Sequence, residues 1–130
     1  MSTLRILESL YAPVWESTRN GRRYGHAAVQ ELERLIGRHV HATESPGLQN
    51  ATAALCGSHV WFDPSWFGSI ADDPYVGPAG VRIIVFHEGG HLVDCENGPG
   101  LAAERFADRY SGFLSGWAGY SSGGIAVFRR

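Results

Sequence analysis

The chain has 130 residues, of which 44% are hydrophobic and 18% are charged. This composition is typical of a globular protein and excludes an intrinsically disordered one, and the length suits one domain spanning residues 1–130. Lys and Arg total 11 against 13 Asp and Glu, which gives a formal charge of −2. This near balance of charges argues against a protein whose main function is to bind nucleic acid or an anionic membrane.

The N-terminal segment and the cysteines bear on the cellular compartment. No stretch reaches the roughly 18 continuous apolar residues of a membrane span. The first residues include Arg5, Glu8 and Glu16 and lack the unbroken apolar core of a signal peptide, so we expect a cytoplasmic protein. Cys56 and Cys95 are too few for a disulfide framework. We therefore expect two free thiols, with a bridge between them as the alternative.

Two helices and a strand are predicted in the first third of the chain. Apolar residues recur every three or four positions over Leu4–Tyr11, which predicts a helix that Pro13 kinks or restarts. The Asn20–Gly21 pair predicts a break in the chain. A second helix is then expected from about His26 to Ile36, followed by a strand within residues 38–44.

The rest of the chain predicts one more strand and two longer helices. The β-rich residues His59–Phe62 predict a strand, which Asp63–Pro64 ends. Residues 65–78 are expected to be loop or short helix. Residues 79–96 are apolar almost all round, which is typical of a buried helix. After a Gly- and Pro-containing loop, another helix is expected over residues 101–117, so the predicted fold class is α+β.

The expected buried helix contains the motif H-E-x-x-H, formed by His87, Glu88, Gly89, Gly90 and His91. Residues four apart share one helix face, so the two imidazoles can bind one metal ion. Glu88 is rotated about 100° from His87, which places its carboxylate beside the metal. There it can take a proton from a metal-bound water as the catalytic base. Chance is the alternative, but these polar side chains need partners inside an apolar helix.

The next helix offers the further carboxylates that such a site needs. Glu104 and Asp108 are four residues apart in an E-x-x-A-D pattern, and Ala107 on the same side is small enough to let the helices approach. We expect Glu104 to be the third ligand of one Zn²⁺, and Asp108 to hold the far nitrogen of a ligand histidine. The alternatives are an ordinary exposed acidic face, or Cys95 as the ligand that closes a structural zinc site.

The H-E-x-x-H motif followed by this second helix resembles the gluzincin zinc metallopeptidases, whose pattern is H-E-x-x-H and then E-x-x-A/S-D. A closer similarity is to the bacterial neutral zinc metallopeptidases, in which a Cys and a strand precede the zinc helix and an ADxYAG-type helix follows it. The matching segments are Cys56, His59–Phe67, Val81–His91 and Ala107–Gly112. They fall within residues 50–120.

This resemblance implies a zincin-like core in which the two ligand helices pack beside a small sheet. It also implies that the strand His59–Phe62 lies at the sheet edge over the metal, where it can bind an extended peptide by strand addition. A plain core strand is the alternative. Gly89 and Gly90 each cost about 1 kcal/mol of helix propensity, and close backbone packing would explain them.

Other polar residues are weaker candidates. A metal-bound reaction needs a donor for the developing oxyanion or a contact to the substrate, and His59, Arg109 and Tyr110 could supply one. His39 and His41 alternate on the expected strand and point to one face. We expect them to be solvated, with a metal role as the alternative.

The function expected from these observations is that of a zinc metallopeptidase, a hydrolase that cleaves a peptide or protein substrate with a metal-activated water and Glu88 as base. Two other classes stay open. One is a zinc-bound interaction module without catalysis. The other is a metalloprotease dedicated to one regulatory protein partner, like the phage-repressor-cleaving metallopeptidases, which also carry H-E-x-x-H and a downstream E-x-x-A motif.

Overall fold

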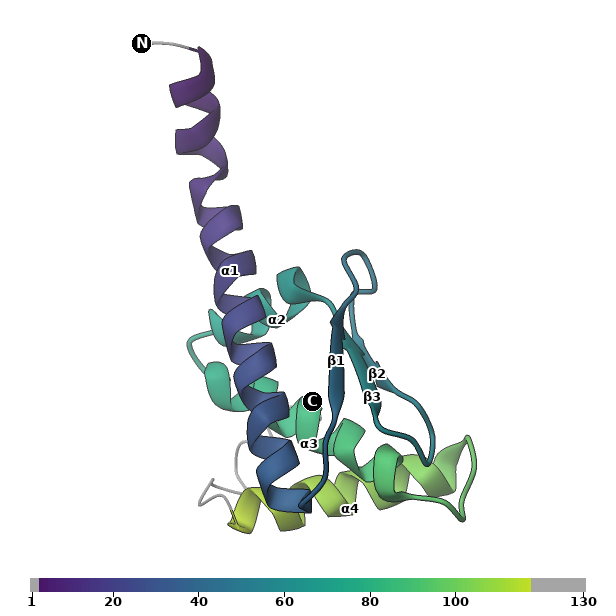
Figure 1. The fold of residues 1–130 in the computed structure, drawn as a ribbon. Helices are drawn as coiled ribbons and strands as arrows, with labels where there is room; N and C mark the ends of the chain where they lie inside the picture. Colours follow the sequence, from purple (N-terminus) through teal and green to yellow (C-terminus); the bar gives the residue numbers. More distant parts are fainter. Residues whose placement is uncertain (1–2, 118–130) are drawn as a thin grey trace.

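The computed structural model describes residues 3–117 of the chain, and the side chains of residues 13–116. The elements in this part are α1 (Thr3–Ile36), β1 (His41–Glu44), β2 (Ala51–Ala53), β3 (His59–Phe62), α2 (Pro64–Ala71), α3 (Pro78–Val93) and α4 (Leu101–Trp117) (Figure 1). The predicted α+β class is therefore confirmed. Within the described residues, no helix combines the length and the apolar character needed to cross a membrane.

The N-terminal segment forms one continuous helix, so the prediction of a break at Asn20–Gly21 was wrong. Pro13 lies inside α1. Gly21 is needed for packing: a Cβ there would lie 1.8 Å from the carbonyl oxygen of Pro64 in α2. Gly25 likewise makes room for the ring of Phe62, which a Cβ would approach to 2.5 Å. These glycines mark a close approach between elements rather than a turn.

The sheet has the strand order β1-β3-β2, with β1 parallel and β2 antiparallel to β3. The strand predicted in residues 38–44 begins only at His41, and the strand predicted at His59–Phe62 has these bounds. The three-residue strand β2 was not predicted. Because β3 pairs on both sides, it is the central strand, and the expectation that it lies at the sheet edge was wrong.

Asp63 ends β3 and begins α2. Its side chain accepts hydrogen bonds from the backbone N–H of Ser65, at 3.0 Å, and of Gln49, at 2.9 Å. The first bond caps the helix N-terminus, where Pro64 stands in the first turn. The second fixes the loop between β1 and β2. The segment after β3, predicted as loop or short helix, therefore contains an eight-residue helix.

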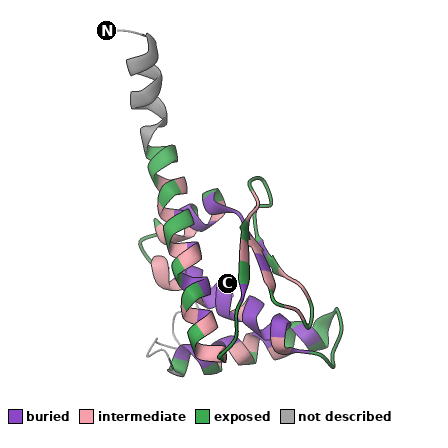
Figure 2. Cartoon of the chain, viewed as in Figure 1, coloured by how far each residue is buried: buried purple, intermediate pink, exposed green. Residues whose placement is uncertain are grey.

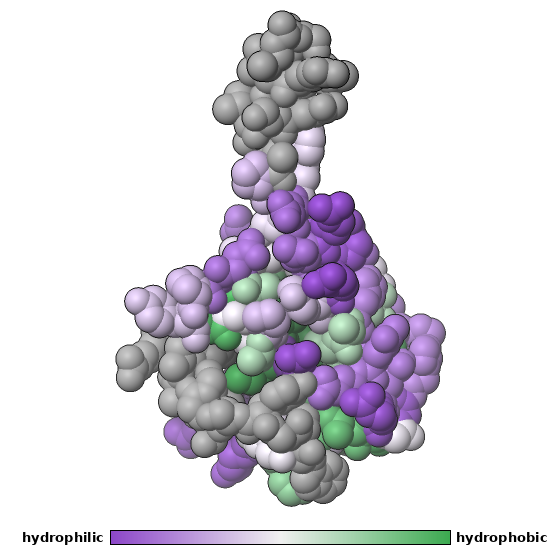
Figure 3. All heavy atoms as spheres, turned by 90° about the vertical axis from the view of Figure 1, so that its left-hand side faces the viewer, coloured by the Kyte–Doolittle hydropathy of each residue, from purple (hydrophilic) through white to green (hydrophobic). Residues whose placement is uncertain are grey.

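The buried helix predicted for residues 79–96 is α3, which ends at Val93 and packs against α1, α2, α4 and β2. Its residues are buried on nearly every face, and most of the α3 ribbon is coloured purple in Figure 2. Val81, Val85, Phe86 and Leu92 are completely buried. On the molecular face shown in Figure 3, hydrophilic side chains surround smaller hydrophobic areas, as expected for a surface in contact with water.

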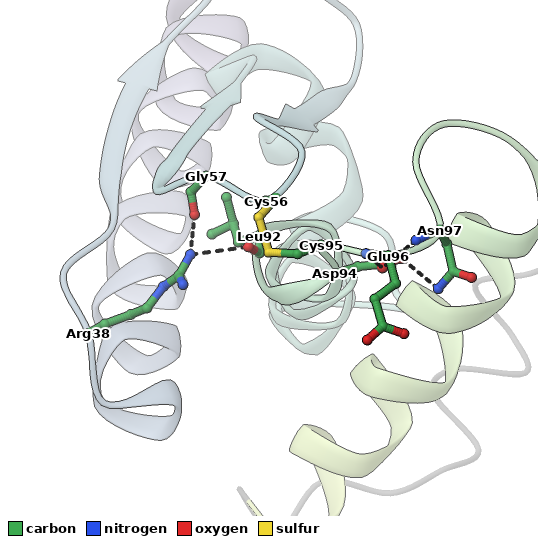
Figure 4. Close-up of a disulfide and its surroundings, with 8 residues drawn as sticks. All are labelled: Arg38, Cys56, Gly57, Leu92, Asp94, Cys95, Glu96 and Asn97. Atoms are coloured by element: carbon green, nitrogen blue, oxygen red, sulfur yellow. Dashed lines mark hydrogen bonds between the residues drawn. A yellow bond between two sulfur atoms is a disulfide. The ribbon is translucent and has the colours of Figure 1, made fainter.

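A disulfide joins Cys56 to Cys95, so the expectation of two free thiols was wrong (Figure 4). The turn between β2 and β3 folds back onto the end of α3, where the Cys56 N–H donates to the His91 carbonyl at 3.0 Å. Arg38 donates to two backbone carbonyls, one in each of these segments. The cysteines are 39 residues apart in sequence, so only the folded chain shows that they meet. Since its sulfur is in this bond, Cys95 is not a zinc ligand here.

Candidate metal centre

Two imidazoles on α3 face a single carboxylate on α4. His87 Nε2 lies 2.9 Å from one oxygen of Glu104, and His91 Nε2 lies 3.1 Å from the other. The imidazole rings stand edge to face, with centroids 5.0 Å apart. Nitrogen and oxygen donors of the types that zinc prefers therefore converge from two helices, as the sequence pattern predicted.

The remaining ring nitrogens differ in their partners. Asp108 Oδ1 lies 3.0 Å from His87 Nδ1, the position predicted for a carboxylate that orients a ligand imidazole. His91 Nδ1 is buried and has no hydrogen-bond partner among the described residues. Both histidines thus turn Nε2 toward Glu104, and the donor set fits a metal ion bound through these two nitrogens.

Glu88 is buried next to the histidine pair, with 7% of its surface exposed. One candidate ligand atom from each of His87, Glu88 and His91 lies within 4.8 Å of the others. Burial raises the pKa of Glu88 to about 8, and the negative charge of Glu104 adds to this shift. A cation bound between the histidines would act in the opposite direction and favour the ionised carboxylate.

Two glycines of the motif allow the neighbouring helices to reach α3. A Cβ on Gly90 would lie 2.6 Å from the Cα of Ala107 in α4, and a Cβ on Gly89 would lie 2.5 Å from the side chain of Leu32 in α1. The hydroxyl of Ser111 also donates to the Ile83 carbonyl at 2.8 Å, which holds α4 against α3. Close backbone packing, the explanation considered for these glycines, is present at Gly90, whereas Gly89 meets the end of the Leu32 side chain.

The site opens into a cleft of about 510 Å³ between β2 and the two ligand helices. The lining residues outside the metal-facing group are Asn50, Ala51, Thr52, Ala53, Leu55, Trp66, Ile83, Ile84, Pro99, Gly100, Ala103 and Ser111. The strand beside the metal-facing group is thus β2 and not β3. The sequence does not predict this wall because Ala51–Ala53 is only three residues long, too short for its alternation to mark a strand.

Three residues predicted to contact the oxyanion or the substrate lie outside the cleft. The ring of His59 stacks on Trp61 at a centroid distance of 4.2 Å, on the sheet face opposite the core. Arg109 is exposed on α4. Tyr110 packs against α3 at Gly90, and burial raises the pKa of its hydroxyl. Among the described side chains of residues 13–116, none of the three lines the cleft, so the structure does not bring them to the metal-facing group.

Comparison of the chain with protein-family models, with curated proteins and with solved structures gave no match in any of the three cases. The resemblance to gluzincins is therefore an expectation that depends on the two helix motifs. A functional assignment therefore depends on the geometry of five residues: His87, Glu88, His91, Glu104 and Asp108.

Proposed function

We propose that this chain is a zinc-dependent metallopeptidase with a zincin-like core that hydrolyses peptide bonds. One observation carries the proposal: the Nε2 atoms of two histidines, 2.9 and 3.1 Å from the oxygens of Glu104, converge beside a buried glutamate at the wall of an open cleft. Structural zinc sites are closed by four protein ligands, whereas catalytic sites keep one position open. Three ligands facing a cleft suit the catalytic class.

His87, His91 and Glu104 would hold the zinc, and Asp108 would fix the ring orientation of His87 through Nδ1. Zinc bound there would lower the pKa of a water ligand and polarise the scissile carbonyl group. Glu88 is within reach of this position because it shares the cluster with both histidines. As a carboxylate it would accept the proton of the attacking water, and it would then deliver that proton to the leaving amine nitrogen.

The walls of the cleft favour an extended peptide as substrate. β2 is an edge strand and lines the cleft, so a peptide can pair with its outer edge as an additional strand. Trp66, Ile83 and Ile84 supply apolar surface for a substrate side chain. A peptide or an unfolded segment of a protein therefore suits the site better than a small polar molecule.

We also propose a compartment, on the ground of the disulfide rather than of the N-terminal segment. Disulfides persist in oxidising environments and are rare in the cytosol. The Cys56–Cys95 bond therefore favours an extracytoplasmic or otherwise oxidising location over the cytoplasmic one expected from the sequence.

The experiment that tests the function compares zinc-loaded wild type, chelator-treated wild type and Glu88→Gln on a mixture of unfolded proteins, with cleavage sites read by mass spectrometry. Glutamine keeps the shape of glutamate but cannot act as the base, so we expect about 10²–10⁴-fold slower cleavage with unchanged zinc content. Glu96→Gln, the same substitution at an exposed glutamate beyond α3, should cleave as wild type does. No cleavage by fully zinc-loaded wild type would favour the non-catalytic interaction module.

A further inference from the structure

We propose a second binding site for a divalent transition-metal ion on the outer face of the sheet, formed by His39, His41 and His59. These residues belong neither to the cleft nor to α3. His41 is the first residue of β1, His59 is the first residue of β3, and the two are paired neighbours in the parallel register. His39 precedes β1 by two positions and therefore lies on the same side as His41.

Two rings of this group lie closer together than those of the first site, and the third ring lies slightly farther away. The centroids of His39 and His41 are 4.4 Å apart with an interplanar angle of 84°. The corresponding values for His87 and His91 are 5.0 Å and 79°. The ring of His59 lies 5.8 Å from that of His41, on the neighbouring strand. Two imidazoles in nearly the same edge-to-face arrangement, with a third beside them, form an all-nitrogen donor set.

In two of these rings, one nitrogen is already in contact with a side-chain oxygen. Glu33 Oε1 lies 2.7 Å from His39 Nδ1, which leaves Nε2 to face a ligand, just as Asp108 does for His87. Thr43 Oγ1 lies 2.6 Å from His59 Nε2, which leaves Nδ1 for a ligand. A carboxylate behind a metal-facing imidazole is the arrangement that raises ligand basicity in metal sites.

The exposure of the three histidines and the metal preference of imidazole indicate which ions this site binds and how tightly. His39 and His41 are exposed and His59 is half-buried, so a hydrated ion can reach all three from solvent. Imidazole donors suit Zn²⁺, Ni²⁺ and Cu²⁺ rather than Mg²⁺ or Ca²⁺. Among the described residues, the group with three ligand atoms within 4.8 Å is the one on α3. Rotation of the exposed rings must therefore accompany binding, and the second site should be the weaker of the two.

The test counts bound ions in the full-length protein, with Zn²⁺ as the probe and inductively coupled plasma mass spectrometry after equilibrium dialysis as the readout. We expect two ions per wild-type chain, one per His41→Gln chain and an unchanged count of two in Glu96→Gln. Glu96 is the control, because it is exposed beyond α3 and does not line the surface hollow that His39 and His41 share with His26. His41→Gln should also leave any peptide cleavage unchanged, which separates this site from the proposed catalytic one.

A second measurement locates the ion. Ni²⁺ is added to protein whose first site is filled with Zn²⁺, and paramagnetic broadening of the Trp61 indole signal is followed by NMR, because Trp61 stacks on His59 at 4.2 Å. We expect broadening in wild type and at least a tenfold weaker effect at the same Ni²⁺ concentration in His41→Gln. Equal zinc counts in wild type and His41→Gln would overturn the proposal and leave the histidines as a cross-strand stack that only stabilises the sheet.

Discussion

His87 has a different partner at each ring nitrogen, and this difference determines what the residue can do. Asp108 holds Nδ1, and Nε2 faces Glu104. A neutral imidazole has one donor and one acceptor nitrogen, so a carboxylate at Nδ1 selects the tautomer with an Nε2 lone pair. That lone pair is what a zinc ion would need. We therefore propose that the side chain of Asp108 strengthens metal binding through His87 without being a ligand itself.

We predict that Asp108→Asn lowers zinc affinity by about 10–100-fold while the protein keeps its fold, because the amide loses the charge that orients His87. A competition titration against a zinc-binding chromophore measures the affinity, and circular dichroism checks the fold. Asp72→Asn, at an exposed aspartate after α2, is the control and should bind zinc as tightly as wild type. Equal affinity in Asp108→Asn would reduce this residue to an ordinary surface acid.

At the scale of the elements, the contact between α3 and α4 sets the distance between the histidines and Glu104. Gly90 faces Ala107 at this contact, and a Cβ at Gly90 would lie 2.6 Å from the Ala107 Cα. Backbone atoms cannot yield as a flexible side chain can, so a larger residue must push the helices apart.

We predict that Gly90→Ala lowers the free energy of unfolding, because overpacking costs about 1–3 kcal/mol and exceeds the gain of roughly 1 kcal/mol in helix propensity. Gly116→Ala in α4 is the matched control, since a Cβ there meets no atom within 4 Å in the described residues. It should raise the free energy of unfolding by about 0.5–1 kcal/mol. Urea denaturation measures both changes, and stabilisation by Gly90→Ala would refute the account of this contact.

A second contact between elements is pH-dependent. Glu44 at the end of β1 lies 2.6 Å from Arg22 and 3.0 Å from His26, both in α1. Burial alone would raise the pKa of Glu44, but the hydrogen bonds and charges of these two residues outweigh it and hold the pKa below its ordinary value.

Because the folded-state pKa of Glu44 is depressed, its stabilising contribution is present above the pKa of the unfolded chain and is lost as pH falls through the folded-state value. We predict that Glu44→Gln lowers the free energy of unfolding by at most about 1 kcal/mol at pH 7, as expected for a pair near the surface. This difference should vanish at acidic pH. A difference between the two proteins that grows on acidification would contradict the assignment.

The elements also show how far the sequence predicts this fold. The bounds of α4 were predicted because a Gly- and Pro-containing loop precedes Leu101. The break at Gly21 was wrong because the sequence does not reveal that α2 packs against that residue. β2 escaped prediction because three residues are too few to show a period. In the candidate site, the spacing in H-E-x-x-H and E-x-x-A-D predicts that five side chains lie together, and they do so in the structure. This works because the spacing of residues on a helix determines the face on which each side chain lies. The wall formed by β2 could not be predicted in this way, because it depends on contacts between residues distant in sequence.

At the scale of the whole molecule, the Cys56–Cys95 bond links the β2–β3 turn to the end of the helix that carries His91. Closing a loop of 39 residues lowers the conformational entropy of the unfolded chain. This loss raises the free energy of unfolding by about 4 kcal/mol. Both cysteines are exposed, so a reductant has access to the bond.

We predict that the double variant Cys56→Ser/Cys95→Ser unfolds with a free energy about 2–4 kcal/mol lower than wild type. Dithiothreitol should lower the stability of wild type by a similar amount and leave the double variant unaffected, which separates loss of the bond from the effect of serine. Equal stability of oxidised and reduced wild type would show that the disulfide does not restrict the unfolded chain as this account requires.

If this chain is a zinc metallopeptidase, His87, His91 and Glu104 together bind its catalytic zinc ion. Anomalous diffraction at the zinc absorption edge, from crystals of the zinc-loaded protein, tests it most directly. The account predicts a peak in the cleft about 2.0–2.2 Å from both Nε2 atoms and from a Glu104 oxygen, with a water in the remaining position and Glu88 beside it. Zinc absent from this position, or bound by Glu88 in place of Glu104, would contradict it.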